Sequence, residues 1–130
     1  MDADVRRCLA DDEITEIVIG SAYKVANELG VGFLEKVYEN SLLHELQKNG
    51  ISAQQQHPIK VVYDDVVVGE FFADLLVEDR IIVELKHSKA IDDAHLAQCL
   101  NYLKATGNTL GLLINFGSPR VQVKRVVLNY

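Results

Sequence analysis

The alternation of apolar and polar residues divides the chain into helices followed by strands. Apolar residues recur at helical spacing over residues 12–29, and again in a second segment over about 33–49. Gly30 and Gly50 supply plausible stop signals for these segments. The first part of the chain is therefore expected to form two amphipathic helices.

The rest of the chain predicts a sheet with one further helix. Pro58 suits an edge strand better than a central one, and the pair Asp64-Asp65 predicts a tight hairpin turn. The expected elements are strands over 51–63, 66–77 and 81–86, a helix over 92–106, and strands over 110–116 and 121–128. This order, α-α-β-β-β-α-β-β, predicts an α/β fold, and the absence of repeats and linkers predicts a single domain over residues 1–130.

Three charged side chains interrupt the apolar strands of the second predicted hairpin. Asp74 lies in its first strand, and Glu84 and Lys86 lie in its second. A three-residue turn pairs Val77 with Ile81 and sets Asp74 opposite Glu84, with their Cβ atoms about 5 Å apart. A two-residue turn would place the two carboxylates on opposite faces, so the prediction depends on this turn.

The neighbouring apolar residues indicate that these charges are buried. Phe72, Leu76 and Ile82 are predicted on the same face and would cover it. Buried charges are costly without close pairing or a metal. The alternative is a cross-strand salt-bridge cluster on a solvated face of the sheet.

The same residues suit metal-assisted chemistry. Asp74 and Glu84 fit a hard cation such as Mg²⁺ or Mn²⁺, which takes oxygen ligands at about 2.1 Å and often only one or two protein carboxylates. The backbone carbonyl of Leu85 can add an uncharged ligand. Lys86 can orient or help deprotonate a metal-bound water, or stabilise charge on a phosphate. The combination predicts hydrolysis of phosphodiester bonds.

These motifs resemble those of the PD-(D/E)XK nuclease superfamily. Asp74 followed by Glu84-Leu85-Lys86 is similar to its bipartite D…(D/E)xK motif, although Ala73 stands where the superfamily name has proline. Gly32-Phe-Leu-Glu-Lys-Val-Tyr38 resembles the GxxExxY signature, and the blocks at 69–77, 98–104 and 112–117 are similar to the bacterial and archaeal GxxExxY family. The resemblance spans about residues 14–127 and implies a restriction-endonuclease-like αβββαβ core, with a mixed central sheet flanked by helices.

The resemblance also implies roles for individual residues. The two acids match metal ligands, and Lys86 matches the catalytic lysine. Glu35 matches an acid that many members contribute from the first core helix; an exposed helical glutamate in an i,i+4 contact is the alternative. Gln98 and Tyr102, one helical turn apart, resemble a Q-xxx-Y element that holds the metal-bound water, the lysine or the substrate. Tyr38 is expected to pack in the core with its hydroxyl hydrogen-bonded.

The net charge of the chain indicates which partners it can bind. The chain has 19 acidic and 13 basic residues and a formal net charge of −6, which disfavours binding nucleic acid by phosphate neutralisation alone. A local basic track is the alternative to an ordinary solvated surface, and it would consist of Lys86, Lys89, Lys104, Arg120, Lys124 and Arg125. We expect DNA or RNA as the substrate, with Tyr102 and Lys89 in contact with it. A non-catalytic nucleic-acid-binding or protein-interaction module on the same fold stays open, as does a homodimer or a partner that supplies basic surface.

Cysteine usage and hydropathy complete the expectations. Cys8 and Cys99 have no CxxC spacing and are expected to be plain thiols. No apolar run approaches the roughly 20 residues that span a bilayer. We therefore expect a cytoplasmic protein without a membrane contact.

Overall fold

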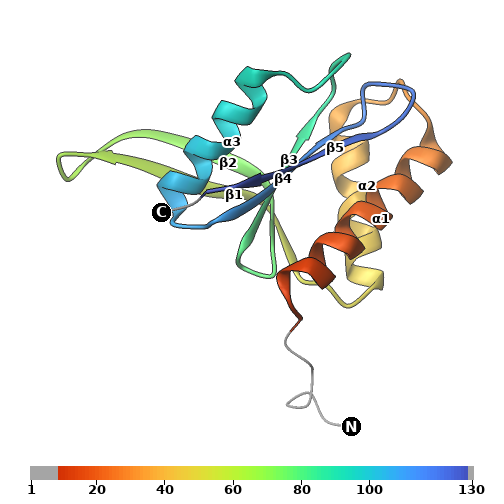
Figure 1. The fold of residues 1–130 in the computed structure, drawn as a ribbon, viewed down its shortest axis with the longest axis horizontal. Coiled ribbons are helices and arrows are strands. Elements are labelled where there is room, and N and C mark those ends of the chain that lie inside the picture. Colours follow the sequence, from red (N-terminus) through yellow and green to blue (C-terminus); the bar gives the residue numbers. More distant parts are fainter. Residues whose placement is uncertain (1–8, 129–130) are drawn as a thin grey trace, which may run out of the picture.

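The computed structural model describes residues 9–128, in which five strands form one mixed sheet in the order β1-β2-β3-β4-β5 (Figure 1). The elements are α1 (Asp11–Leu29), α2 (Glu35–Lys48), β1 (Ala53–Tyr63), β2 (Val66–Val77), β3 (Ile81–Lys86), α3 (Asp93–Thr106), β4 (Leu110–Asn115) and β5 (Gln122–Val127). Strands β3 and β4 are parallel, and the other neighbours are antiparallel. The predicted α/β fold and element order are confirmed, and Pro58 lies in an edge strand.

Helices cover both faces of this sheet. Helices α1 and α2 pack on one face, and α3 packs on the other (Figure 1). Strand β4 is buried along its whole length, and β3 is buried from Ile81 to Glu84. This burial on both faces explains why the two strands are almost continuously apolar in sequence.

The turn between β2 and β3 has the predicted three residues. Val77 pairs with Ile81, and Glu78 and Asp79 adopt left-handed φ angles of 52° and 56°. The amide of Arg80 donates to the carbonyl of Val77 at 3.1 Å. The predicted register is therefore confirmed. The paired residues end at Leu75 and Val83, one step before Asp74 and Glu84.

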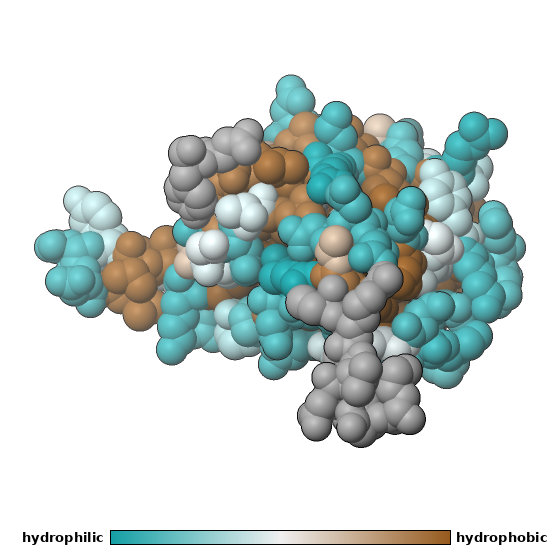
Figure 2. Space-filling model, turned by 60° about the horizontal axis from the view of Figure 1, so that its bottom comes forward, coloured by the Kyte–Doolittle hydropathy of each residue, from teal (hydrophilic) through white to brown (hydrophobic). Residues whose placement is uncertain are grey.

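Residues 57–73 of the β1–β2 hairpin form an arm, whose tip extends beyond the helices (Figure 1). Apolar residues cluster along it (Figure 2), and those exposed are Val62, Tyr63, Val66, Val67, Val68, Phe71 and Phe72. Side-chain alternation breaks at the base of the arm, because Ala73 and Leu76 both belong to the core under α3. The break coincides with Gln56, whose φ is 49°, and with a missing pair between Gln56 and Asp74.

This break overturns the prediction for Phe72. Its side chain is 50% exposed and covers no part of the charged cluster. Phe71 contacts Tyr102 of α3 instead, with ring centroids 5.7 Å apart. Leu76 and Ile82 are buried as predicted.

The remaining expectations concern cysteines and membrane spans. Cys99 is a free, buried thiol, and Cys8 lies outside the described residues. Over residues 9–128, no helix combines the length and apolar character needed to cross a bilayer.

Candidate active site

Asp74 joins β2 to β3 through its side chain. Its Oδ2 accepts a hydrogen bond from the amide of Leu85 at 2.7 Å, and its Oδ1 accepts one from Nε2 of Gln56 at 3.3 Å. The carboxylate thus lies where the two strands stop pairing. Its half-buried side chain is held by these two hydrogen bonds.

Glu84 is buried without a full set of partners. It is 4% exposed, and its Oε1 has no hydrogen-bond partner among the described residues. The pKa of Glu84 is raised to about 9, mainly by burial and then by the charge of Asp74 and a hydrogen bond with it, and Lys86 partly offsets this rise. Two neighbouring carboxylates, one of them with an unsatisfied buried oxygen, form a site whose charges favour a bound cation.

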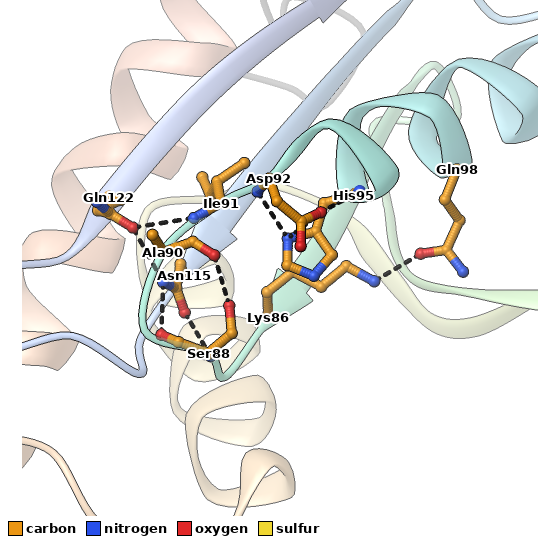
Figure 3. A network of polar contacts seen from close by, with 9 residues as sticks. All are labelled: Lys86, Ser88, Ala90, Ile91, Asp92, His95, Gln98, Asn115 and Gln122. Atoms are coloured by element: carbon orange, nitrogen blue, oxygen red, sulfur yellow. Dashed lines mark hydrogen bonds and ion pairs between the residues drawn. The ribbon is translucent and has the colours of Figure 1, made fainter.

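Lys86 lies at the end of β3, half-buried and directed toward α3. Its Nζ donates a hydrogen bond to Oε1 of Gln98 at 2.6 Å (Figure 3). Over the described residues, no ion pair includes Asp74, Glu84 or Lys86. The alternative of a solvated salt-bridge cluster therefore does not describe this site.

Burial and the charge of Glu84 also raise the pKa of two side chains on α3. Burial raises the pKa of Tyr102, and the charges of Glu84 and Asp74 raise it further. Burial likewise raises the pKa of Cys99 to about 12, with Glu84 the next contribution. Tyr102 is 9% exposed, so most of its ring packs within the α3 core. Helix α3 thus brings Gln98 and Tyr102 to the same side of the sheet as the acids.

Glu35 begins α2 and lies near Lys86. Its exposed side chain lines a small cavity with Tyr38, Leu85 and Lys86. In the part of the chain that the structure describes, no group of three or more His, Cys, Asp or Glu side chains is arranged to hold a metal. The structure therefore places Glu35 beside the lysine, and does not gather it with the two acids as a third ligand.

Tyr38 packs in the core, as predicted. Its hydroxyl donates to the carbonyl of Gly30 at 2.6 Å and accepts from the amide of Phe33 at 3.3 Å. Its ring stacks on Phe116 with centroids 4.9 Å apart. Tyr38 thus fixes the loop before α2 against the sheet.

Sequence reasoning missed two residues that connect α2 to Asp74. Nε2 of Gln56 donates to Oε1 of Glu39 at 2.9 Å and also contacts Oδ1 of Asp74. Glu39 is 5% exposed, and its Oε2 accepts from Lys36 and Gln55, each at 2.8 Å. One feature of the sequence could have indicated Glu39: it lies one helical turn after Glu35, and therefore on the same side of the helix.

The loop after Lys86 is fixed by the end of β4 (Figure 3). Asn115 is fully buried; its Oδ1 accepts from the amide of Ser88 at 3.0 Å, and its Nδ2 donates to the Ser88 carbonyl at 2.8 Å. A Cβ on Gly117 would lie 2.4 Å from the Ser88 nitrogen, so only glycine fits there. Lys89 follows as an exposed residue of this loop.

The six cations considered from sequence do not share one surface. Arg125 forms an ion pair with Asp12 of α1 at 3.1 Å, on the face that α1 covers. Lys104 lies on α3, on the opposite face. A continuous basic track through all six residues is therefore wrong.

The fold and site define a class of protein. A mixed sheet flanked by helices carries an acid on β2 and an E-x-K triplet on β3, with a glutamine of α3 bound to the lysine. This is the arrangement of a restriction-endonuclease-like fold. The sequence model of the PD-(D/E)XK nuclease superfamily matches residues 12–126. The chain belongs to that superfamily.

A solved structure supports the fold. The protein described as "Crystal structure of SSO0001" is 19% identical, with a TM-score of 0.58, and the match covers 92% of this chain and 60% of that one. At this identity the similarity shows the fold alone. Because the match covers 60% of that protein, this chain spans less than two thirds of its length. No curated protein matches the sequence.

Proposed function

We propose that the protein is a divalent-metal-dependent nuclease that hydrolyses phosphodiester bonds in DNA or RNA, and that it belongs to the GxxExxY family within the superfamily. The observation that carries this proposal is the buried Oε1 of Glu84, which has no partner among the described residues and lies beside Asp74. A cation offers that oxygen a partner and allows both acids to be ionised side by side.

The oxygen atoms present fit Mg²⁺ or Mn²⁺. Asp74 and Glu84 would hold the ion with the backbone carbonyl of Leu85. In a β-strand, the N–H and C=O of one residue point to the same neighbouring strand. Since the Leu85 amide donates to Asp74, its carbonyl faces that edge as well. A bound ion supplies Lewis acidity, which lowers the pKa of a coordinated water.

The remaining residues position the reacting groups. Gln98 holds the ammonium of Lys86 at the edge of the site, where it would stabilise charge on the phosphate or assist proton removal from the attacking water. Glu35 would act from the α2 side of Lys86 as a catalytic acid or an outer ligand. Tyr102 and Lys89 would contact the substrate.

Calorimetry with Mn²⁺ and a cleavage assay test the proposal together. We expect the wild type to bind the ion, and Asp74→Ala and Glu84→Ala to lose that binding. Lys86→Ala should keep ion binding while losing cleavage of labelled DNA and RNA, because the lysine acts on the reacting groups. Absence of ion binding to the wild type would contradict the proposal.

A non-catalytic nucleic-acid-binding module is the second candidate. A protein-interaction module on the same fold is the other non-catalytic possibility, and the net charge of −6 favours it, because the chain has no excess positive charge with which to attract a polyanionic substrate. Binding of DNA or RNA without cleavage, with Mg²⁺ and with Mn²⁺, would favour the nucleic-acid-binding module. A mass measurement in solution tests whether a second copy contributes to the surface.

A further inference from the structure

A groove of about 860 Å³ lies between the arm and α3. One wall includes Lys60 and Phe71 of the arm, and the other includes Gln98, Tyr102 and Lys104 of α3. The volume lies within the roughly 300–1,000 Å³ of pockets that enclose small organic groups. Neither wall contributes to the proposed metal ligands, so the groove is a feature separate from the carboxylate pair.

The charge of the groove differs from that of the whole chain. Acidic residues outnumber basic ones by 19 to 13 overall, yet the lining contains lysines at positions 60 and 104 and no acid. Both lysines are exposed, and neither forms an ion pair with a described residue. The groove therefore offers two lysine cations to an anionic ligand, one of which, Lys60, lies opposite Glu70 in the register of the arm.

The groove also carries an aromatic surface. Phe71 is 45% exposed, and its ring lies against Tyr102 at an interplanar angle of 38°. Val61 and Ala97 extend the apolar lining. Because Tyr102 packs against the ring of Phe71, the exposed ring can stack on a planar group of a ligand. Such stacking removes apolar area from water without ordering a flexible side chain.

One residue links the groove to the candidate active site. Gln98 lines the groove, and its Oε1 accepts the hydrogen bond from Nζ of Lys86. A chain bound along the groove would therefore reach Lys86 without crossing the buried core.

We propose that this groove binds a single-stranded segment of nucleic acid, with a base stacked on Phe71 and phosphates beside Lys60 and Lys104. The inference rests on the proposed function, since it takes nucleic acid as the substrate and names its strandedness. Aromatic rings and lysines in one groove are typical of single-strand binding. A duplex would gain less, because its bases are stacked inside and cannot cover the apolar walls.

Fluorescence anisotropy of a labelled single-stranded oligonucleotide tests the inference, in a chelator so that binding is separated from metal-dependent cleavage. We expect tighter binding of the single strand than of the same sequence as a duplex. Phe71→Ala should raise Kd about 5- to 150-fold, the range for loss of one base–aromatic stack. Phe72→Ala is the matched control, because Phe72 is equally exposed on the same arm and does not line the groove. Thermal unfolding verifies that both variants fold.

The outcomes separate this inference from the proposed nuclease activity. Equal Kd changes in the two phenylalanine variants, or duplex binding as tight as that of the single strand, would overturn the inference. Single-strand binding that depends on Phe71, with no cleavage under Mg²⁺ or Mn²⁺, would support the groove and contradict the nuclease. Cleavage of duplex DNA that is unaffected by Phe71→Ala would support the nuclease and contradict the groove.

Discussion

At the scale of single residues, the site contains two residues in energetically unfavourable environments. Glu84 is almost fully buried beside Asp74, and burial and Asp74 together favour its protonated form in the metal-free protein. Gln56 adopts a left-handed φ that is rare outside glycine, while its amide joins Glu39 to Asp74. Both features oppose stability, and under the proposed function a bound cation would compensate the first of them.

The metal-free protein should lose stability as pH rises. The pKa of Glu84 is about 9 in the folded state against an ordinary value of 4.5, so between these values the folded state keeps a proton that the unfolded state has lost. The free energy of unfolding therefore falls across this window, by up to about 1.4 kcal/mol per pH unit. Chemical denaturation in a chelator should show this slope in the wild type and its loss in Glu84→Gln. Glu70→Gln, an exposed control on the arm, should follow the wild type; parallel curves for all three proteins would contradict the prediction.

Gln56 should affect metal binding more than stability. Gln56→Gly removes the amide that holds Asp74 and relieves a backbone strain of about 1 kcal/mol or more. We expect about 10- to 100-fold weaker Mn²⁺ binding by calorimetry, as for other residues that support metal ligands, with little change in unfolding free energy. Gln54→Ala is the control, since the side chain of Gln54 contacts the ring of His57 at 2.9 Å and does not hold Asp74. Unchanged Mn²⁺ affinity in Gln56→Gly would contradict the role.

At the scale of elements, the ends of β3 and β4 determine where the loop after Lys86 lies. The two strands run in parallel, and the Lys86 carbonyl accepts from the Phe116 amide at 2.9 Å. Asn115 and Gly117 then hold Ser88 against the end of β4. The position of this loop follows from the contacts of β4 with it, and not from its own sequence.

A side chain at position 117 should displace this loop. Gly117→Ala places a Cβ 2.4 Å from the Ser88 nitrogen, and overpacking of this kind costs about 1–3 kcal/mol. We expect a lower unfolding temperature together with a loss of cleavage. Gly20→Ala is the opposite case, because its Cβ would meet nothing within 4 Å on helix α1. It should raise stability by about 0.5–1 kcal/mol and leave cleavage unchanged; equal destabilisation of both variants would contradict the argument.

The helices and strands also show which features can be predicted from the sequence and which cannot. Hydrophobic periodicity and terminal glycines locate every helix and strand, because these signals are local. The turn after Val77 fixes the register, so Asp74 and Glu84 follow from sequence. Phe72 was misplaced because the alternation of β2 breaks at a left-handed residue of the neighbouring strand, which has no local signal.

Contacts between distant segments were also beyond the reach of sequence patterns. Glu39 and Gln56 meet only when α2 packs beside β1, and Asn115 meets Ser88 only when β4 lies beside β3. Their residue types are common on helix surfaces and at strand ends. The sequence therefore predicts the acids and the lysine, and packing is needed to identify the residues that hold them in place.

At the scale of the whole molecule, acidic residues outnumber basic ones, while the lining of the groove contains two lysines and no acid. The net charge of −6 leaves long-range attraction for a polyanion weak. Lys60 and Lys104 in the groove and Lys86 at its end are therefore expected to supply most of the phosphate contacts. An apolar and aromatic contribution from Phe71 would then carry a larger share of the binding free energy than in a basic nucleic-acid-binding protein.

This distribution predicts a shallow salt dependence of single-strand binding. Each phosphate neutralised on a single strand contributes about −0.7 to the slope of log K against log salt, so three lysines give a slope of about −2. Lys60→Gln and Lys104→Gln should each reduce its magnitude by about 0.7, measured by anisotropy over a salt titration in a chelator. Lys48→Gln is the matched control, because Lys48 is exposed at the end of α2 and paired with Glu45 at 3.2 Å. A slope much steeper than −2, or an equal reduction in Lys48→Gln, would show that phosphates contact other surfaces of the protein.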